Sequence, residues 1–147
     1  NAYIVKPDEG AGGDGIYITA DPSQPRHGTC VVQEYCTKPL LLGGLKCDFR
    51  VYVTVVRAFP APAVFVHREG LARVAVLPYE PPTRGNLSTA AIHLTNCSIS
   101  KHHSAFVPNT DAHADQSSTR RRLTTAAAQL EAEHGPTTFS VDRFFAA

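Results

Sequence analysis

The pattern of hydrophobic and polar positions divides the chain into a strand-rich first part and a helical end. Short runs rich in Val, Ile, Tyr and Phe, in which polar and apolar residues alternate, are typical of half-buried β-strands. Loops rich in Gly and Pro separate these runs. The predicted strands are Tyr3–Val5, Ile16–Thr19, Thr29–Tyr35, Lys46–Arg57, Ala63–Arg68 and Leu71–Leu77.

Helical periodicity is confined to the C-terminal part of the sequence. Leu123–His134 predicts a helix that Gly135 and Pro136 end. A further helix is predicted to start at Val141 with Ser140 as its cap. The polar segment Ser98–Ser118 predicts a mobile loop. Strands followed by helices indicate an α+β fold with a mixed, antiparallel-rich sheet.

Composition and charge narrow the class of protein. The length of 147 residues suits one domain, and a 43% apolar fraction is enough for a core. The net charge of +1 argues against a nucleic-acid partner. The spacing of the four cysteines indicates free thiols in a reducing compartment. No apolar run is long enough for a membrane span and no signal peptide opens the chain, so we expect a cytoplasmic protein. We also expect a monomer.

Two features indicate a piece of a longer protein. The sequence contains no Met. The last predicted helix stops after about two turns, where a longer helix is expected.

One predicted strand carries an unusual series of charges, in the stretch K-C-D-F-R-V-Y-V. Side chains alternate along a strand, so Lys46, Asp48, Arg50 and Tyr52 share one face. The other face, with Cys47, Phe49, Val51 and Val53, is expected to point into the core. The charged face is either an ordinary solvated face or a set of cations held for chemistry.

A glycine-rich loop follows the first strand. Gly10, Gly12 and Gly15 form a G-x-G-x-x-G pattern, but they precede a strand, whereas the dinucleotide fingerprint opens a helix. A strand–glycine–strand hairpin can fold over phosphates with its backbone N–H groups, or it can be a plain surface turn. Lys6 precedes the loop, which is the reverse of the order in protein kinases. A lysine, a glycine hairpin and then an apolar strand with a polar end at Gln33 is the order of an ATP-grasp nucleotide site.

With these pieces in order, the chain resembles the tubulin-tyrosine-ligase-like family, from about Tyr3 to Thr125. The matching motifs are I-V-K-P with G-x-G-I, V-V-Q-E-Y, K-P-L-L, K-C-D-F-R-V-Y-V, R-E-G-L-A-R and H-L-T-N-C-S-I-S-K. The segments K-P-D-E-G, K-H-x-x-x-F-V and R-R-R-L-T-T are most similar to those of the tubulin polyglutamylases.

The resemblance implies an ATP-dependent ligase of the ATP-grasp fold. Such an enzyme phosphorylates a carboxylate in the acidic C-terminal tail of tubulin, and the amine of free glutamate then attacks the acyl phosphate. Residues 1–100 would form a partial nucleotide-binding core, and 101–147 a polar loop and helical segment of the same domain. The implied location is the microtubule cytoskeleton, including the cilium or basal body, with no membrane and no nucleic acid as partner.

The resemblance also implies roles for individual residues. Lys46 and Arg50 would face the γ-phosphate and the acyl phosphate, and Asp48 would orient a cation or help to bind the amine. Arg68 would bind a carboxylate or phosphate. The residues implied in nucleotide binding are Lys6, Gly13, Gly15, Gln33, Glu34, Tyr35, Lys46, Asp48, His93, Thr95 and Asn96.

Ordinary structural roles remain open for several of these residues. His93 would otherwise be a hydrogen-bonded core histidine, and Arg68 would form a surface ion pair with Glu69. Thr95 and Asn96 would cap a turn. Arg120–Arg122 reads as a solvated run, or as the positive surface that collects an acidic tail.

The sequence departs from the family pattern in two places. The acidic residues and Asn that hold Mg²⁺ in this family have no counterpart in Phe139–Ala147, so those ligands are expected outside this chain, and the chain alone is expected to be inactive. Ala11 and Gly12 stand where polyglutamylases carry other residues. The alternatives are therefore a glycine or tyrosine ligase of the same family, or a tubulin-binding protein without catalytic activity.

Overall fold

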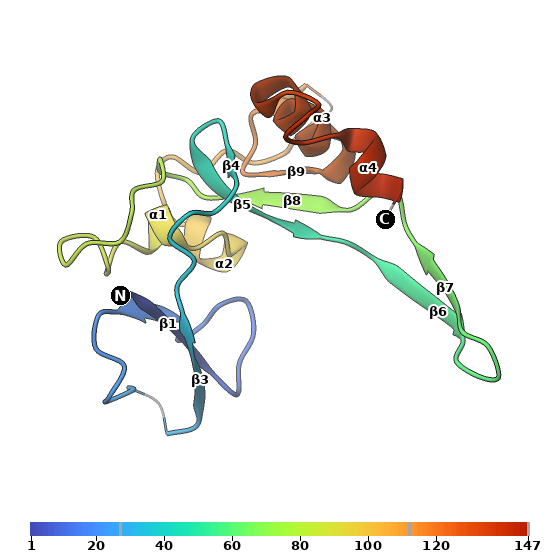
Figure 1. Ribbon diagram of the computed structural model, residues 1–147. Helices are drawn as coiled ribbons and strands as arrows, with labels where there is room; N and C mark the ends of the chain where they lie inside the picture. The colour runs from blue at the N-terminus through green and yellow to red at the C-terminus, as the bar shows by residue number, and fades with distance from the viewer. Residues whose placement is uncertain (27, 112, 147) are drawn as a thin grey trace. The chain divides into compact units, whose positions relative to one another are not determined.

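The computed structural model describes residues 1–26, 28–111 and 113–146, which form antiparallel sheets and mostly short helices (Figure 1). They gather in two compact units. Unit 1 contains Asn1–Lys46 and Ala75–Phe106, and unit 2 contains Cys47–Val74 and Val107–Ala147. Antiparallel strands followed by helices confirm the predicted α+β class.

Unit 1 is built on a three-stranded antiparallel sheet. Its order is β2 (Tyr17–Thr19), β1 (Tyr3–Pro7) and β3 (Cys30–Glu34). Ala2, Ile18 and Tyr35 are buried together, and Ile4, Tyr79 and Leu87 pack against them. Removal of this apolar surface from water is the main stabilising contribution to the unit. Two short helices follow the sheet in sequence, α1 (Ala90–His93) and α2 (Cys97–Ser100).

A short strand pairs with the start of the charged stretch. β4 (Leu41–Leu42) pairs with the first residues of β5 (Leu45–Arg50), with Leu41 opposite Lys46. No strand was predicted at Leu41 and Leu42. Gly43 and Gly44 have φ values of 59° and 75°, which permit the tight turn between the two strands.

Unit 2 combines a sheet with the longest helix. The later residues of β5 pair with β8 (Leu71–Val74), and β8 pairs with β9 (Arg120–Arg122). Helix α3 (Leu123–His134) matches its predicted bounds. Four of its side chains recur on one face and are buried, as in an amphipathic helix: Leu123, Ala126, Ala127 and Leu130. The turn η1 (Ala114–Gln116) precedes β9, and α4 (Val141–Ala146) places the Phe144 ring 5.6 Å from that of Phe49.

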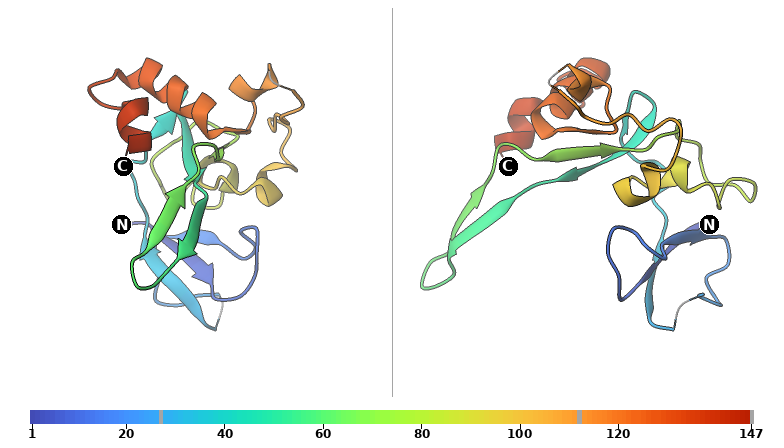
Figure 2. Two further views of the ribbon diagram at one scale, coloured as in Figure 1. Left: turned by 90° about the vertical axis from the view of Figure 1, so that its right-hand side faces the viewer. Right: turned by 180° about the vertical axis from the view of Figure 1, so that it is seen from behind.

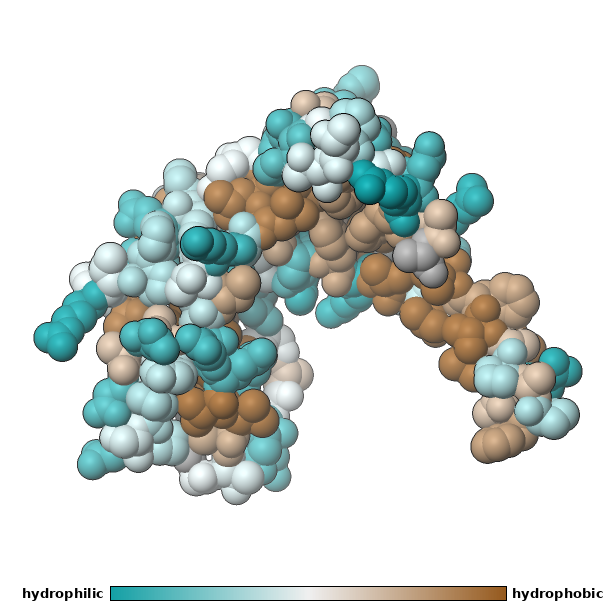
Figure 3. Space-filling view, viewed as in Figure 1, coloured by the Kyte–Doolittle hydropathy of each residue, from teal (hydrophilic) through white to brown (hydrophobic). Residues whose placement is uncertain are grey.

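The prediction of one strand from Lys46 to Arg57 is wrong. β5 ends at Arg50, and β6 (Val53–Arg57) pairs with β7 (Ala63–Val66) in a separate ribbon that extends from the sheet of unit 2 (Figures 1 and 2). Val51 and Val53, predicted to face the core, are exposed. No second layer covers this ribbon among the described residues, and Figure 3 shows its apolar surface. Its exposed apolar side chains are Val53, Val55, Val56, Phe59, Val64, Phe65 and Val66.

Two further predictions need correction. Ser98–Ser118 is not simply a mobile loop, because it contains residues of α2 and η1 and the buried Asp115. Arg120–Arg122 forms a strand in which Arg120 and Arg122 are exposed, as predicted for a solvated run, but Arg121 is only 8% exposed. No helix of the described residues is long and apolar enough to span a membrane, and the four cysteines are free.

Candidate functional site

Three predicted site residues meet in unit 1, at the end of β3 and the start of β5. Lys46 donates hydrogen bonds from Nζ to the Tyr35 hydroxyl at 3.0 Å and to the backbone carbonyl of His93 at 2.8 Å. Its ammonium also lies 4.5 Å from the centre of the Tyr35 ring, which is cation–π geometry. We call Tyr35, Lys46 and His93 the Lys46 cluster. These contacts orient a flexible lysine and keep its charge at one place.

His93 is fully buried within this cluster. Its Nδ1 lies 3.2 Å from the Tyr35 hydroxyl. The same hydroxyl accepts a hydrogen bond from Lys46, so the phenol links the ammonium to the imidazole. Nε2 is buried and makes no hydrogen bond of ordinary geometry to the described residues, although the backbone of Asn86 still acts on the ring. A buried polar atom without a well-formed hydrogen bond is uncommon and costs free energy.

The charge state of His93 follows from its surroundings. Burial lowers the pKa of the imidazole, and the Lys46 charge lowers it further, while the backbone of Asn86 and the charge of Glu80 oppose this. The ring is therefore neutral at pH 7. Burial also raises the pKa of Tyr35, so its hydroxyl keeps its proton. Lys46 supplies the positive charge of the cluster at neutral pH.

The glycine loop packs against the start of α2. Gly10, Gly12, Gly13 and Gly15 all have positive φ, a conformation that favours glycine. Ser98 donates a hydrogen bond to the carbonyl of Gly12. A Cβ on Gly13 would lie only 2.5 Å from Cγ of Asn96, the N-cap residue of α2. The predicted residues Gly13 and Asn96 are therefore in direct contact.

The backbone of this loop offers donors to an anion. Asp14 and Ile16 use their N–H groups in turns, to the carbonyls of Ala11 and Gly13. Gly12 and Gly13 donate no backbone hydrogen bond to the rest of the described chain. These N–H groups fit phosphate oxygens, as backbone nests do.

Lys6 and Gln33 meet on neighbouring strands. Lys6 donates to the side-chain oxygen of Gln33 at 3.0 Å, and both groups are on the exposed part of the sheet. Glu34 is exposed at the end of β3, opposite Tyr3, whereas Thr95 is buried. Lys6 is therefore placed to meet a ligand from solvent.

A pocket lined in part by the loop is less suited to phosphate. Its volume is about 560 Å³, and its lining includes Gly15, Arg26 and the acidic residues Asp8, Glu9 and Asp14. Carboxylates at this density repel a triphosphate.

The remaining predicted residues lie in unit 2, and the sequence analysis missed the partner of one of them. Asp48 accepts two hydrogen bonds from Arg73, at 2.7 and 2.8 Å, in a bidentate pair across β5 and β8. Register alone would have found this pair, because Asp48 and Arg73 are directly opposite. Arg50, the last residue of β5, is exposed and makes no side-chain hydrogen bond or ion pair to the described residues.

Arg68 lies beside a pocket of about 320 Å³ formed with α3 and α4. Thr124, Val141, Asp142 and Phe145 are among its lining residues. Arg68 forms no ion pair with Glu69 in the described structure. Glu69 instead accepts hydrogen bonds from the hydroxyl and N–H of Thr124, at 2.8 and 3.3 Å, and thereby caps α3. The guanidinium of Arg68 stays exposed.

The arginines of β9 serve the fold of unit 2. Arg121 donates to the carbonyl of Ser118 at 2.7 Å and to Gln129 at 2.8 Å. Arg122 donates to Asp115 from its backbone N–H at 2.9 Å and from Nε at 3.1 Å. Because these contacts engage two of the three side chains, they argue against the hypothesis that Arg120–Arg122 is a surface that binds an acidic tail. No three His, Cys, Asp or Glu side chains gather as metal ligands in the described parts of the chain.

Comparisons with a family profile and with individual known proteins agree on one family. The profile of the tubulin-tyrosine ligase family matches residues 1–140. Tubulin polyglutamylase TTLL13 of Mus musculus is 41% identical over 136 residues, which are 91% of this chain and 16% of that protein. Tubulin polyglutamylase TTLL6 of Homo sapiens is 43% identical over 130 residues, 88% of this chain and 14% of that protein. Tubulin polyglutamylase ttll-11 of Caenorhabditis elegans is 41% identical over 132 residues, 88% of this chain and 18% of that protein. The chain thus spans less than a fifth of the length of these relatives.

Proposed function

Because this chain belongs to the tubulin-tyrosine ligase family, we propose that it is part of the catalytic core of an ATP-dependent ligase that adds glutamate to tubulin. The acceptor would be a carboxylate side chain in the acidic C-terminal tail. The choice of glutamate is supported by similar relatives that are named tubulin polyglutamylases. The structural observation that carries the proposal is the Lys46 cluster, which fixes one cation beside a neutral, buried histidine.

The chemistry requires fixed positive charge. ATP transfers its γ-phosphoryl group to the acceptor carboxylate and leaves as ADP. The amine of glutamate attacks the acyl phosphate, loses a proton and expels inorganic phosphate, so that an amide bond remains. Negative charge spreads over phosphoryl oxygens and then over a tetrahedral centre, and cations held in place stabilise both.

Residues of unit 1 would bind the nucleotide. Lys46 would contact phosphate oxygens from the position that Tyr35 and the His93 carbonyl impose. The N–H groups of Gly12 and Gly13, which donate to no described residue, and the charge of Lys6 would add to this binding. Gln33, Glu34 and Tyr35 would border the adenine and ribose. His93, Thr95 and Asn96 would lie beside the triphosphate, with Gly15 completing the loop.

Residues of unit 2 would act on the acyl phosphate and the incoming amino acid. Arg50 and Arg68 are exposed, and neither forms an ion pair within the described residues, so both guanidinium groups are available to a carboxylate or phosphate. Asp48 is engaged with Arg73, which would hold its carboxylate in one orientation. Mg²⁺ would supply further charge neutralisation, with its ligands outside this chain. The partial ATP-grasp assignment of residues 1–100 belongs to the same proposal.

The test uses the longest protein that carries this sequence, since relatives are several times longer. It is incubated with microtubules, Mg²⁺-ATP and equal amounts of glutamate, glycine and tyrosine, and the tubulin tails are weighed by mass spectrometry. Glutamate mass that is lost in Lys46→Ala, but kept in the exposed-lysine control Lys38→Ala, supports the proposal. A mass increase that matches glycine or tyrosine would show that the donor amino acid is not glutamate.

The same assay separates the alternatives of another class. No added mass, together with retained tubulin binding, would make the protein a non-catalytic tubulin-binding member of the family. We expect the active protein on microtubules in the cytoplasm, including those of cilia and basal bodies. A tagged protein that stays away from microtubules would contradict that location.

A further inference from the structure

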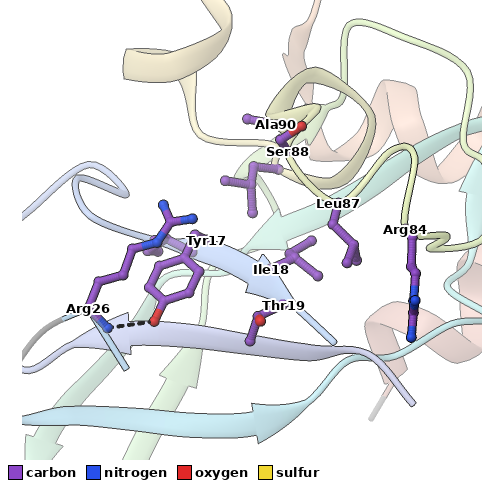
Figure 4. A pocket seen from close by; sticks show the side chains of 10 residues that line it. Tyr17, Ile18, Thr19, Arg26, Arg84, Leu87, Ser88 and Ala90 are labelled. Atoms are coloured by element: carbon purple, nitrogen blue, oxygen red, sulfur yellow. Dashed lines mark hydrogen bonds between the residues drawn. The ribbon is translucent and has the colours of Figure 1, made fainter. Parts of the chain in front are cut away.

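Unit 1 contains a second concave site, away from the Lys46 cluster. It is a pocket of about 460 Å³ along β2, shown in Figure 4. The lining contains four consecutive residues, Ile16 to Thr19, so the pocket follows the strand rather than one face of it. β2 pairs only with β1 among the described strands, so no described strand lies along its other edge.

The rim of this β2 groove is positively charged. Arg26 and Arg84 line it from separate loops, and Figure 4 shows them on opposite sides of the opening. Both are exposed, and neither side chain forms an ion pair or hydrogen bond to the described residues. The groove has no acidic side chain in its lining.

Local contacts keep one guanidinium in position. The Arg26 group lies 4.5 Å from the centre of the Tyr17 ring, and its own backbone N–H donates to the Tyr17 hydroxyl at 2.8 Å. A guanidinium held on an aromatic ring loses less entropy when it binds an anion. The second charge at Arg84 and the hydroxyl of Ser88 complete a polar rim.

The floor of the groove is apolar. Ile18 and Leu94 are buried there, and Leu87 and Ala90 form part of the lining. An apolar floor beneath two cations suits a chain that carries carboxylates and also some apolar surface. It is less suited to a free inorganic anion, which gains nothing from the floor.

We propose that the β2 groove binds an extended acidic peptide. The peptide would lie in the groove along β2, with its apolar side chains on the floor and its carboxylates paired with Arg26 and Arg84. The proposed function supplies the source of such a peptide, since the tail of tubulin is acidic. On that basis the groove would hold the tail at a distance from the reacting carboxylate.

The test measures binding of a fluorescein-labelled peptide of alternating Glu and Val by anisotropy, with the 147-residue chain and no ATP. Each of Arg26→Ala and Arg84→Ala is expected to weaken binding about threefold, and the double variant about tenfold. Ser88→Tyr, which fills the opening without a change of charge, is expected to weaken binding as well. A peptide with Gln in place of Glu is expected not to bind.

A matched control removes the same charge elsewhere in unit 1. Lys38 and Lys101 are exposed and do not line the groove, so Lys38→Ala/Lys101→Ala is expected to bind the peptide within a factor of two of the unchanged chain. Equal loss in both double variants, no effect of Ser88→Tyr, or stronger displacement by inorganic phosphate than by NaCl of equal ionic strength would overturn the proposal.

Failure of this inference and failure of the proposed function give different results. Peptide binding that depends on Arg26 and Arg84, in a protein that ligates no amino acid, would support the groove as a peptide site and contradict the ligase activity. Ligation to tubulin that is unchanged by substitution of both arginines, with no peptide binding, would support the ligase activity and contradict the groove as a peptide site.

Discussion

The Lys46 cluster and the polar cluster around Asp115 show two different uses of buried polar groups. Asp115, 2% exposed, accepts hydrogen bonds from Asn109, Arg122 and Thr125. We call these four residues the Asp115 cluster. Its carboxylate is surrounded by donors, as expected of a structural group. In the Lys46 cluster, by contrast, Nε2 of His93 is buried and makes no hydrogen bond of ordinary geometry to the described residues.

The two clusters are therefore expected to contribute differently to stability and to function. A fully satisfied network rigidifies its surroundings and stabilises the fold. An unsatisfied buried atom costs free energy, and its retention points to a role beyond folding. We therefore expect changes in the Asp115 cluster to affect unfolding, and changes in the Lys46 cluster to affect ligation.

The largest effect is expected from Asp115→Ala. The change leaves the amide of Asn109 and the backbone N–H of Arg122 without their acceptor, so the free energy of unfolding should fall by about 3 kcal/mol. Urea unfolding followed by circular dichroism measures it. The control is Asp142→Ala, an exposed acid in α4 of the same unit, with an expected loss of about 0.5 kcal/mol. Equal losses would contradict a structural role for the cluster.

The Asp115 cluster also predicts an acid limit of stability. Burial alone would raise the pKa of Asp115, but hydrogen bonds from Thr125, Arg122 and Asn109 outweigh it and lower the pKa from 3.8 to about 2. A depressed folded pKa stabilises the fold above the unfolded value. This contribution is complete above about pH 5 and is lost as the pH falls through 3.8 towards 2. Asp115→Asn should abolish this pH-dependent contribution to the free energy of unfolding. Urea unfolding curves recorded at a series of pH values between 6 and 2 measure it.

The next largest effect is on ligation by Lys46→Ala. Loss of a fixed cation next to developing phosphoryl charge is expected to slow ligation about 100-fold. The free energy of unfolding should change by only about 1 kcal/mol, because the lysine contributes two hydrogen bonds at the edge of the core. Lys46→Arg should not restore the rate, since a planar guanidinium cannot reproduce both contacts. A rate within threefold of the unchanged protein would argue against the role of Lys46.

A smaller effect is expected at the glycine loop. Gly13→Ala combines a φ of 93° with a Cβ that would collide with Asn96, so it should destabilise the loop by about 1 to 2 kcal/mol. Thermal unfolding and ATP affinity, the latter by isothermal calorimetry, measure the change. Gly13→Ala/Asn96→Ala should recover the part due to the collision but not the part due to φ. No recovery in thermal stability would show that the contact with Asn96 is unimportant.

The smallest effect concerns His93 and pH. Burial lowers its pKa below 6.5, so the unfolded chain binds a proton that the folded chain does not, and stability falls as the pH falls below 6.5. His93→Gln should lose roughly 1 kcal/mol at pH 8, through the bond to Tyr35, and flatten the profile between pH 8 and pH 5. If the free energy of unfolding of the variant still falls between pH 8 and pH 5, another titrating group causes the pH dependence.

Sequence reasoning found the local features that strong patterns mark. The bounds of α3 follow from helical spacing and from Gly135, and the β6–β7 hairpin follows from two apolar runs around a proline turn. The meeting of Lys46 with Tyr35 could not be derived, because it depends on the path of the chain between β3 and β5. The role of Arg121 was missed for the same reason, since a charged run gives no sign that a helix will cover one of its side chains.

Register information would have improved the reading of the charged strand. Alternation assigned two faces to this strand, but burial does not alternate along β5, and the pattern could not show that the strand leaves its partner at Arg50. Val51 and Val53 therefore looked like core residues and are exposed. Asp48 was expected beside Lys46 and Arg50 on its own strand, whereas its bidentate partner is Arg73 on the neighbouring strand.

The most direct measurement compares Lys46→Ala and Asp115→Ala on the same preparations, by the ligation rate on microtubules and the free energy of unfolding. For Lys46→Ala we predict a loss of about 100-fold in rate with nearly unchanged stability. For Asp115→Ala we predict a loss of about 3 kcal/mol in stability, with the rate retained per folded molecule. Normal ligation by Lys46→Ala would contradict the assignment of this cluster to catalysis.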